Sequence, residues 1–356
     1  MNNRQHILDW GPGELAAWCQ QRNIPSYRAE QVLQWIYQKN VFEFGAMSNL
    51  PADLKVLLND EFLILSGQQA RQSTSDDDTL KILTRWSDEN LTETVMIPEK
   101  TRRTVCVSSQ VGCPVGCTFC ASGMEGLTRS LKPGEMVEQV LRIQALLGPD
   151  HRVGNIVMMG MGEPLANYQH VLTAVRTFNA SWAFGIGARQ ITISTVGLPD
   201  RIRKLAHEEL QFTLAVSLHA GNESVRQQII PWAQRTSTEE LFSAIDYFYD
   251  QTHREVTLEY ILLDGVNTSD QDADKLAYWA RQSRCNVNLI NYNEVAELPF
   301  KRLSADGARA FKNRLRRRGI NAHLRPSRGR DIDAACGQLR RRHLYPVTQQ
   351  DKPTAG

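Results

Sequence analysis

The segment Cys113-Pro-Val-Gly-Cys117-Thr-Phe-Cys120 places three cysteines within eight residues, in the pattern C-x-x-x-C-x-x-C. It comes soon after a β-rich run, Thr104–Ser108, so we expect it to form a loop at the carboxyl end of a strand. Gly112, Gly116 and Gly123 allow this loop to turn tightly. Three thiolates from one loop can bind three irons of a 4Fe–4S cluster, whose fourth iron then stays open to a substrate.

A structural zinc site is the alternative interpretation of these thiols. Such a site needs four closed ligands. Cys106 belongs to the preceding β-rich run, and the next histidine along the chain is His151, so neither completes the set. Spacing and location therefore favour a cluster held by Cys113, Cys117 and Cys120.

The chain of 356 residues carries seven cysteines, and neither this odd number nor their clustering is typical of a secreted disulfide framework. The first residues, Met1 to Trp10, have no basic-then-apolar pattern, and no run of about 18 apolar residues occurs. We therefore expect a cytoplasmic protein with reduced thiols and no membrane span. With 42% hydrophobic and 22% charged residues, wholesale disorder is excluded.

From about residue 102 onward, β-rich and amphipathic helical segments alternate, which is typical of a parallel sheet covered by helices. The expected strands are Thr104–Ser108, Asn155–Gly160, Gln190–Thr195, Gln211–Leu218, Glu255–Leu263 and Asn286–Asn291. The expected helices are Pro133–Leu147, Tyr168–Phe178, Pro199–Ala206, Thr238–Asp250, Ser269–Gln282 and Ser304–Arg318. Six units are too few for a closed eight-stranded barrel, so the sequence predicts an α/β fold with a partial (βα)6 barrel and its site at the carboxyl ends of the strands.

Other segments are expected before and after this core. Tyr27–Lys39 and Leu50–Leu65 are predicted to be helical, and the whole of residues 1–70 has helical character. Thr79–Trp86 and Leu91–Pro98 flank a polar turn and predict a hairpin. The expected division is a helical accessory domain at 1–72, a β-hairpin extension at 73–101, the core at 102–345 and a flexible tail at 346–356.

The formal net charge is only +2, but the charge is unevenly distributed. The segment 301–343 holds 14 Lys and Arg and only 3 Asp. Such a block either binds the phosphates of a polyanion such as RNA or forms a solvated helix face. Its arginines include Arg314, Arg316, Arg317, Arg318, Arg325, Arg328, Arg330, Arg340, Arg341 and Arg342.

Several predicted strand ends carry polar side chains or bare backbone: Gly160-Met-Gly162-Glu163-Pro, Ser194-Thr-Val-Gly, Ser217-Leu218-His219-Ala and Asn291-Tyr-Asn293. Ordinary turn chemistry would also place such residues there. Together with the cysteine triplet, they resemble radical S-adenosylmethionine (SAM) enzymes, in which the open iron of a 4Fe–4S cluster binds SAM and reduces it to a 5′-deoxyadenosyl radical. The resemblance implies that SAM is bound by Gly162, Glu163, Ser194, Ser217, Leu218, His219 and Asn293.

Three longer motifs narrow this resemblance. They are Cys106-Val-Ser-Ser-Gln-Val-Gly-Cys113, Gly160-Met-Gly-Glu-Pro-Leu165 and Asp331-Ile-Asp-Ala-Ala-Cys336-Gly-Gln-Leu339. Over nearly its whole length, the chain resembles the RlmN/Cfr family of adenosine methyltransferases. The resemblance implies methylation of carbon 2 of an adenosine in the peptidyl-transferase region of 23S rRNA, and of the adenosine 3′ of the tRNA anticodon. It also implies two SAM molecules per turnover and an electron donor such as flavodoxin or ferredoxin.

Two cysteines outside the triplet gain a role from this resemblance. By itself, Cys106 in an apolar strand is typical of a small buried hydrophobe, whereas Cys336 lies among alanine and glycine residues that leave room for another molecule. The resemblance implies that SAM methylates Cys336, that the methyl carbon then joins the RNA, and that Cys106 attacks the sulfur of Cys336 to release the product. It implies Glu93 as the proton acceptor, with an exposed strand carboxylate as the alternative.

Two other functions stay open. A carbon-8 adenosine methyltransferase of the same family, the antibiotic-resistance type, shares every motif quoted above. A non-catalytic iron–sulfur protein that binds RNA is a different class, and for binding alone Cys336 in its small-residue setting is not needed. The methylated nucleoside distinguishes the first alternative, and formation of 5′-deoxyadenosine the second.

Overall fold

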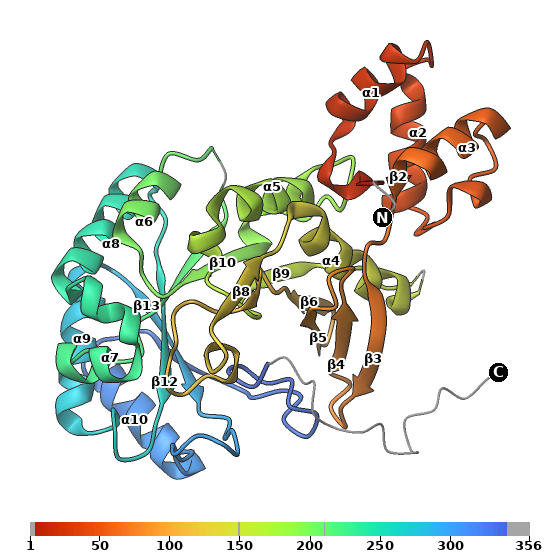
Figure 1. Ribbon diagram of the computed structural model, residues 1–356. Coiled ribbons are helices and arrows are strands. Elements are labelled where there is room, and N and C mark those ends of the chain that lie inside the picture. Colours follow the sequence, from red (N-terminus) through yellow and green to blue (C-terminus); the bar gives the residue numbers. More distant parts are fainter. Residues whose placement is uncertain (1–3, 149, 210, 340–356) are drawn as a thin grey trace.

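The computed structural model describes residues 4–148, 150–209 and 211–339 of the chain. In these ranges a ten-stranded sheet forms the centre, in the order β14-β13-β12-β11-β10-β9-β6-β5-β4-β3 (Figure 1). Its parallel strands are β6 (Arg102–Cys106), β9 (Asn155–Met158), β10 (Ile191–Thr195), β11 (Thr213–Ser217), β12 (Thr257–Leu262), β13 (Asn286–Asn291) and β14 (Ala322–Arg325).

All six expected strands of the core are present, and a seventh, β14, continues the parallel sheet. It pairs with β13, with Val287 opposite Ala322 and Ile290 opposite Arg325. The sequence predicts no strand there because the surrounding segment is dominated by arginine rather than by an apolar pattern. Strands β14 and β3 lie at opposite ends of the sheet, so the barrel is open, and the prediction of a partial α/β barrel is confirmed.

Helices connect the parallel strands and lie along the outer face of the sheet (Figure 1). They are α4 (Pro133–Leu147), α5 (Tyr168–Asn179), α6 (Pro199–Leu205), α7 (Glu223–Ile229), α8 (Thr238–Thr252), α9 (Asp270–Gln282) and α10 (Ala305–Arg317). In α4, Val137, Val140 and Leu141 are fully buried at helical spacing, which fixes the face that packs on the sheet. In the described ranges, no helix has the length and apolar character that a membrane span requires.

Three helices at the N-terminal end form a group beside α4: α1 (Pro12–Gln21), α2 (Tyr27–Tyr37) and α3 (Ala52–Glu61) (Figure 1). The short strands β1 (Gln5–His6) and β2 (Phe62–Leu63) pair next to them. Asp9 Oδ1 accepts a hydrogen bond of 2.7 Å from the backbone N–H of Gly134 at the start of α4. The fully buried Glu138 accepts the backbone N–H of Ser66 at 2.6 Å, so both ends of the group are tied to α4.

The antiparallel part of the sheet is larger than the predicted hairpin. The expected hairpin is formed by β4 (Leu80–Arg85) and β5 (Leu91–Glu99), but β3 (Gln68–Thr74) adds a further strand on the edge. The prediction of helical character up to residue 70 is wrong here. All but one of the β3 residues are exposed, so they show no apolar period, and the strand forms because it pairs with β4.

Candidate active site

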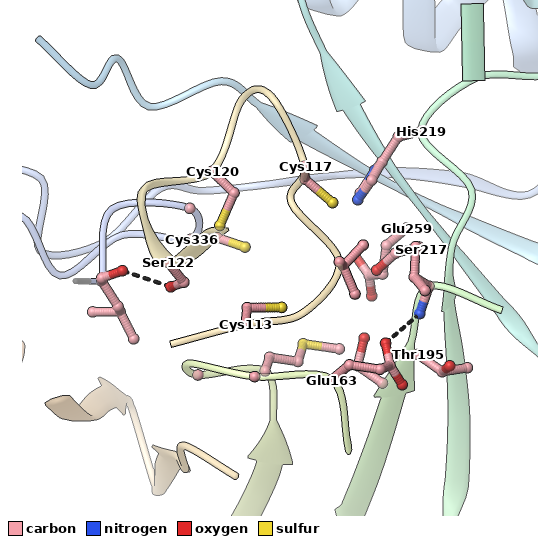
Figure 2. Close-up of a pocket in the computed structure, with 18 of the residues that line it drawn as sticks. Cys113, Cys117, Cys120, Ser122, Glu163, Thr195, Ser217, His219, Glu259 and Cys336 are labelled. Atoms are coloured by element: carbon pink, nitrogen blue, oxygen red, sulfur yellow. Dashed lines mark hydrogen bonds between the residues drawn. The ribbon is translucent and has the colours of Figure 1, made fainter. Parts of the chain in front are cut away.

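A cavity lies at the carboxyl ends of the parallel strands and encloses about 890 Å³, including its open mouth (Figure 2). Nine of the side chains and backbone positions predicted from the sequence line it: Cys113, Cys117, Cys120, Gly162, Glu163, Ser194, Ser217, His219 and Cys336. The fold therefore brings together strand ends, the cysteine loop and a segment near the C-terminal end.

The cysteine loop is closed at its base by a short antiparallel pair, β7 (Gln110–Gly112) and β8 (Leu127–Ser130). Gly116 has φ +70°, a left-handed conformation that favours glycine. A Cβ atom on Gly123 would lie 3.2 Å from the backbone nitrogen of Cys117, so a side chain here would push the loop backbone apart. The result is a compact loop whose three sulfur atoms point into one space (Figure 2).

The three thiols form a donor set that suits an iron–sulfur cluster. Burial raises the pKa of each of them, that of Cys113 to about 12, so the metal-free loop carries protons that cluster binding must displace. Within the described ranges, no three Cys, His, Asp or Glu side chains converge on a point that could hold a single metal ion. A structural zinc site needs four ligands around one ion. In a 4Fe–4S cluster, by contrast, each thiolate binds a different iron.

The end of β9 supplies both a bare backbone and a carboxylate. Gly162 has φ +107°, and a Cβ atom there would lie 2.7 Å from the hydroxyl of Ser109. Glu163 accepts the backbone N–H of Leu165 at 3.0 Å and that of Val196 at 2.8 Å, which ties the end of β9 to the end of β10 (Figure 2). Burial raises the pKa of Glu163 to about 7. The carboxylate thus fixes the shape of this wall of the cavity.

Neighbouring strand ends add hydroxyl groups and an imidazole. Ser194 lies near the end of β10, and Ser217 is the last residue of β11. His219 follows in a left-handed conformation, with φ +58°, and its Nδ1 accepts the backbone N–H of Ile261 at 3.1 Å. Its ring also lies edge-on to Phe119 of the cysteine loop, with 5.0 Å between the ring centres. Because burial lowers the pKa of His219 to about 3, the ring is neutral at physiological pH.

Cys336 lines the cavity and is exposed. It lies on residues 329–339, the Cys336 segment, which is hydrogen-bonded to the cysteine loop. The backbone N–H of Ala121 donates to the carbonyl of Gly337 at 2.8 Å, and the Ser122 hydroxyl donates to the carbonyl of Leu339 at 2.5 Å (Figure 2). Burial raises the pKa of the Cys336 thiol to about 12, with smaller contributions from Cys120 and Glu259. Cys336 thus lines the cavity, while its thiol is surrounded by protein.

Cys106 lies behind this segment, at the end of β6. It is buried and packs with Val95, Met161, Ala334 and Leu339 in a small apolar cluster. Burial, with a smaller contribution from a nearby charge on Cys336, raises the pKa of Cys106 to about 12. The fold therefore brings into one neighbourhood two thiols from opposite ends of the core.

Two residues predicted to bind SAM do not line the cavity. The Leu218 side chain is fully buried in the hydrophobic core. Asn293 donates from Nδ2 to the carbonyl of Cys336 at 3.3 Å and accepts from Arg302 at 3.1 Å. In this structure, the Asn293 side chain holds the Cys336 segment.

Glu93 lies on β5 beneath the Cys336 segment and does not line the cavity. It is only 3% exposed, so its interpretation as an exposed strand carboxylate is wrong. Lys81 forms an ion pair of 2.8 Å with Glu93 and also donates to the carbonyl of Asp333 at 3.1 Å. Lys81 is a functional candidate that the sequence does not reveal, because a lysine in a strand ordinarily faces solvent.

We expect that Lys81→Met lowers the free energy of unfolding by about 3–5 kcal/mol, because it breaks the buried ion pair with Glu93. Urea denaturation measures this change. The double variant Lys81→Met/Glu93→Gln should recover much of the loss, since the buried negative charge is then gone. A single variant as stable as the wild type would show that the pair is hydrated and weak.

The turn between β3 and β4 holds the start of the same segment. The Ser75 hydroxyl and the backbone N–H of Asp76 both donate to the carboxylate of Asp331. In return, Asp77 accepts the backbone N–H of Gly329 at 3.2 Å. In the sequence this turn is simply a polar, acidic loop, and only the fold shows that it positions the Cys336 segment.

Comparison with known proteins agrees with this geometry. Residues 107–277 match the model of the radical SAM superfamily, and residues 5–64 match that of the ribosomal RNA large subunit methyltransferase N-terminal domain. A "probable dual-specificity RNA methyltransferase RlmN" of Rhodopirellula baltica is 42% identical over 95% of this chain and 91% of its own. One of the same description from Acaryochloris marina is 45% identical over 94% of each. The crystal structure of a radical SAM methyltransferase from Sphaerobacter thermophilus has a TM-score of 0.92 and 43% identity, over 94% of this chain and 99% of that one.

A partial α/β barrel that holds a three-cysteine loop at the carboxyl ends of its strands, together with these matches, defines a radical SAM enzyme. The chain belongs to the RlmN family and is a SAM-dependent RNA methyltransferase of the radical SAM class. A 4Fe–4S cluster and SAM are the cofactors of that superfamily.

Proposed function

We propose that this enzyme methylates carbon 2 of adenosine in RNA and uses Cys336 as the methyl carrier. The observation that carries the proposal is the position of Cys336. Cys336 lines the same cavity as Cys113, Cys117 and Cys120, and Cys106 lies close behind it. An RNA-binding protein without catalytic activity has no need for this arrangement of thiols.

In this proposal, Cys113, Cys117 and Cys120 hold a 4Fe–4S cluster. Gly162, Glu163, Ser194, Ser217 and His219 form the cavity wall that binds SAM. The cluster, when bound, supplies the electron that cleaves SAM to a 5′-deoxyadenosyl radical. The Leu218 backbone and Asn293 belong to the same site by resemblance, although their side chains face elsewhere.

The two other thiols divide the methyl transfer between them. The Cys336 thiolate first takes a methyl group from one SAM by displacement at the methyl carbon. A second SAM then supplies the radical that removes a hydrogen atom from this S-methyl group, and the resulting carbon radical adds to the adenine ring. Glu93 would accept the proton that the ring carbon loses, and the unpaired electron of the adduct would pass to the oxidised cluster. Cys106 would then attack the sulfur of Cys336, and the bond between this sulfur and the methylene carbon would break with its electron pair on carbon. Protonation of that carbon completes the methyl group of the released RNA and leaves a Cys106–Cys336 disulfide, which a reductant must reopen.

The substrates we propose are an adenosine in the peptidyl-transferase region of 23S rRNA and the adenosine 3′ of a tRNA anticodon. The dual specificity that relatives carry in their descriptions supports both. An adenine must leave its stack to reach a buried site, so a loop or a flipped base is required. A flavodoxin or ferredoxin is the proposed electron donor, and the cytoplasm, where RNA and reductant meet, is the proposed location.

The proposed division of labour along the chain follows the sequence prediction. A helical accessory domain spans 1–72, a β extension spans 73–101, and the radical SAM core spans 102–345. The position of the N-terminal helices and the family match over 5–64 support a separate accessory domain, but β3 (Gln68–Thr74) crosses the boundary at 72 and belongs to the β extension. The proposed tail at 346–356 and the arginines Arg340, Arg341 and Arg342 lie outside the described residues.

The arginines of the basic block differ in whether an acidic side chain pairs with them. Arg314 pairs with Asp270, and Arg318 pairs with Asp274. Arg316 and Arg317 are exposed, and no acidic partner for them is found among the residues that the structure describes. The last turn of α10 therefore offers two cations to a phosphate backbone.

We expect that Arg316→Gln/Arg317→Gln weakens RNA binding and reduces the slope of log K against log salt by about 1.5, because two fewer counterions are released. Filter binding across a salt series measures the slope. Arg318→Gln is the matched control, since its guanidinium already pairs with Asp274 and should change the slope less. An unchanged slope in the double variant would assign this turn to a solvated helix face.

The proposed function is tested by incubating the anaerobically reconstituted enzyme with SAM, a reductant and ribosomal RNA. We expect 5′-deoxyadenosine together with methylated RNA. Binding of RNA without either product would favour the non-catalytic alternative.

A further inference from the structure

Glu259 is a buried acidic residue in the wall of the cavity that the sequence did not single out. It lies on β12, directly opposite Ser217 of β11 and Asn288 of β13 in the strand register. Its side chain is among those that line the cavity, next to Ser217 (Figure 2). The residue is only 3% exposed.

The two oxygens of the Glu259 carboxylate differ in their hydrogen-bond partners. Oε1 accepts a hydrogen bond of 3.1 Å from Nδ2 of Asn288 and lies 3.7 Å from Nη1 of Arg325. Oε2 is buried and has no hydrogen-bond partner among the residues that the structure describes. A buried carboxylate oxygen without a donor is costly, so the site is incomplete until a ligand supplies one.

We propose that Oε2 of Glu259 accepts a hydrogen bond from the adenosyl group of SAM, through a ribose hydroxyl or the exocyclic amine. This inference rests on the proposed function. Ser194, Ser217 and Glu259 lie on three adjacent strands and line one cavity, so Glu259 extends the wall that is assigned to SAM. In this proposal, Glu259 binds SAM and takes no part in carrying the methyl group.

The difference in exposure decides between SAM and the RNA base as the partner of Glu259. Cys336 is the part of the cavity wall that reaches the surface, since this residue is exposed. Glu259 is almost fully covered by protein and is reached only through the cavity. A small ligand that fills the cavity can reach Oε2, whereas a base attached to its RNA backbone meets Cys336 first.

The test compares Glu259→Gln and Glu259→Met in the anaerobically reconstituted holoenzyme. Equilibrium dialysis without RNA should show Kd for SAM raised about 10- to 100-fold in Glu259→Met, with a smaller rise in Glu259→Gln, which keeps one acceptor oxygen. Glu255→Gln is the matched control, an exposed carboxylate just before the same strand, and should leave Kd unchanged.

SAM analogues identify the donor. One analogue lacks the 2′-hydroxyl and another lacks the exocyclic amine. The analogue without the donor to Glu259 should bind the wild type more weakly, and it should bind Glu259→Met no more weakly than SAM does, as in a double-mutant cycle. An unchanged Kd for SAM with a raised KM for RNA would overturn the proposal in favour of the target adenosine. An unchanged Kd and KM with a lowered Tm would reduce Glu259 to a structural partner of Arg325. Failure of the proposed function itself is distinguishable, because the wild type would then form no methylated RNA.

Discussion

Alanine in place of Cys113, Cys117 and Cys120 removes the iron from the protein and reduces 5′-deoxyadenosine formation below detection. We expect about four irons per chain in the anaerobically reconstituted wild type and fewer than about 0.5 in the triple variant. The reason is that one loop supplies the three thiols of the cavity wall, and Cys336 on a separate segment is needed for another task. Iron analysis and the visible absorption of the cluster measure the loss.

The matched control for this experiment is Cys285→Ala, which removes a buried thiol at the amino end of β13. Its iron content and 5′-deoxyadenosine formation should equal those of the wild type. One tightly bound zinc per chain, with no iron in anaerobically purified wild-type protein, would contradict the assignment of the cysteine loop.

The second large effect concerns the two remaining thiols, which should fail at different steps. Cys336→Ala removes the carrier, so neither a protein-bound methyl group nor a methylated RNA should form. Cys106→Ala keeps the carrier and the radical but lacks the thiol that attacks the Cys336 sulfur. It should therefore accumulate RNA that is covalently linked to Cys336, with product formation reduced at least 100-fold.

Denaturing gels with labelled RNA, combined with mass spectrometry of the peptide that contains Cys336, distinguish these outcomes. Cys19→Ala, which removes a buried thiol in α1, should behave as the wild type. Normal turnover of Cys106→Ala without trapped RNA would show that the proposed order of steps is wrong.

The sequence indicates which residues meet in this cavity, because they are local to one motif or to strand ends. The spacing of Cys113, Cys117 and Cys120 and the six β-rich runs are sufficient to place the loop at one edge of the sheet. Parallel strands present their carboxyl ends on the same side, so Ser194 and Ser217 necessarily come near the loop.

Features that depend on distant partners could not be predicted in this way. Lys81 is buried because it pairs with Glu93 and the carbonyl of Asp333, and nothing in its own neighbourhood of the sequence indicates this. Strand β3 forms because it pairs with β4. Its own residues do not alternate between apolar and polar, so the sequence gives no sign of a strand. Glu259 looks like one more polar residue in a strand until the register places its carboxylate in the cavity.

The central claim is most directly tested by nucleoside mass spectrometry of RNA after reaction with the anaerobically reconstituted enzyme, SAM and a reductant. With ribosomal RNA and tRNA that lack the modification, we predict 2-methyladenosine in both. The methyl carbon should come from labelled SAM by way of Cys336. Appearance of 8-methyladenosine would contradict the assignment to carbon 2, and an absence of any methylated adenosine would contradict the proposed function as a whole.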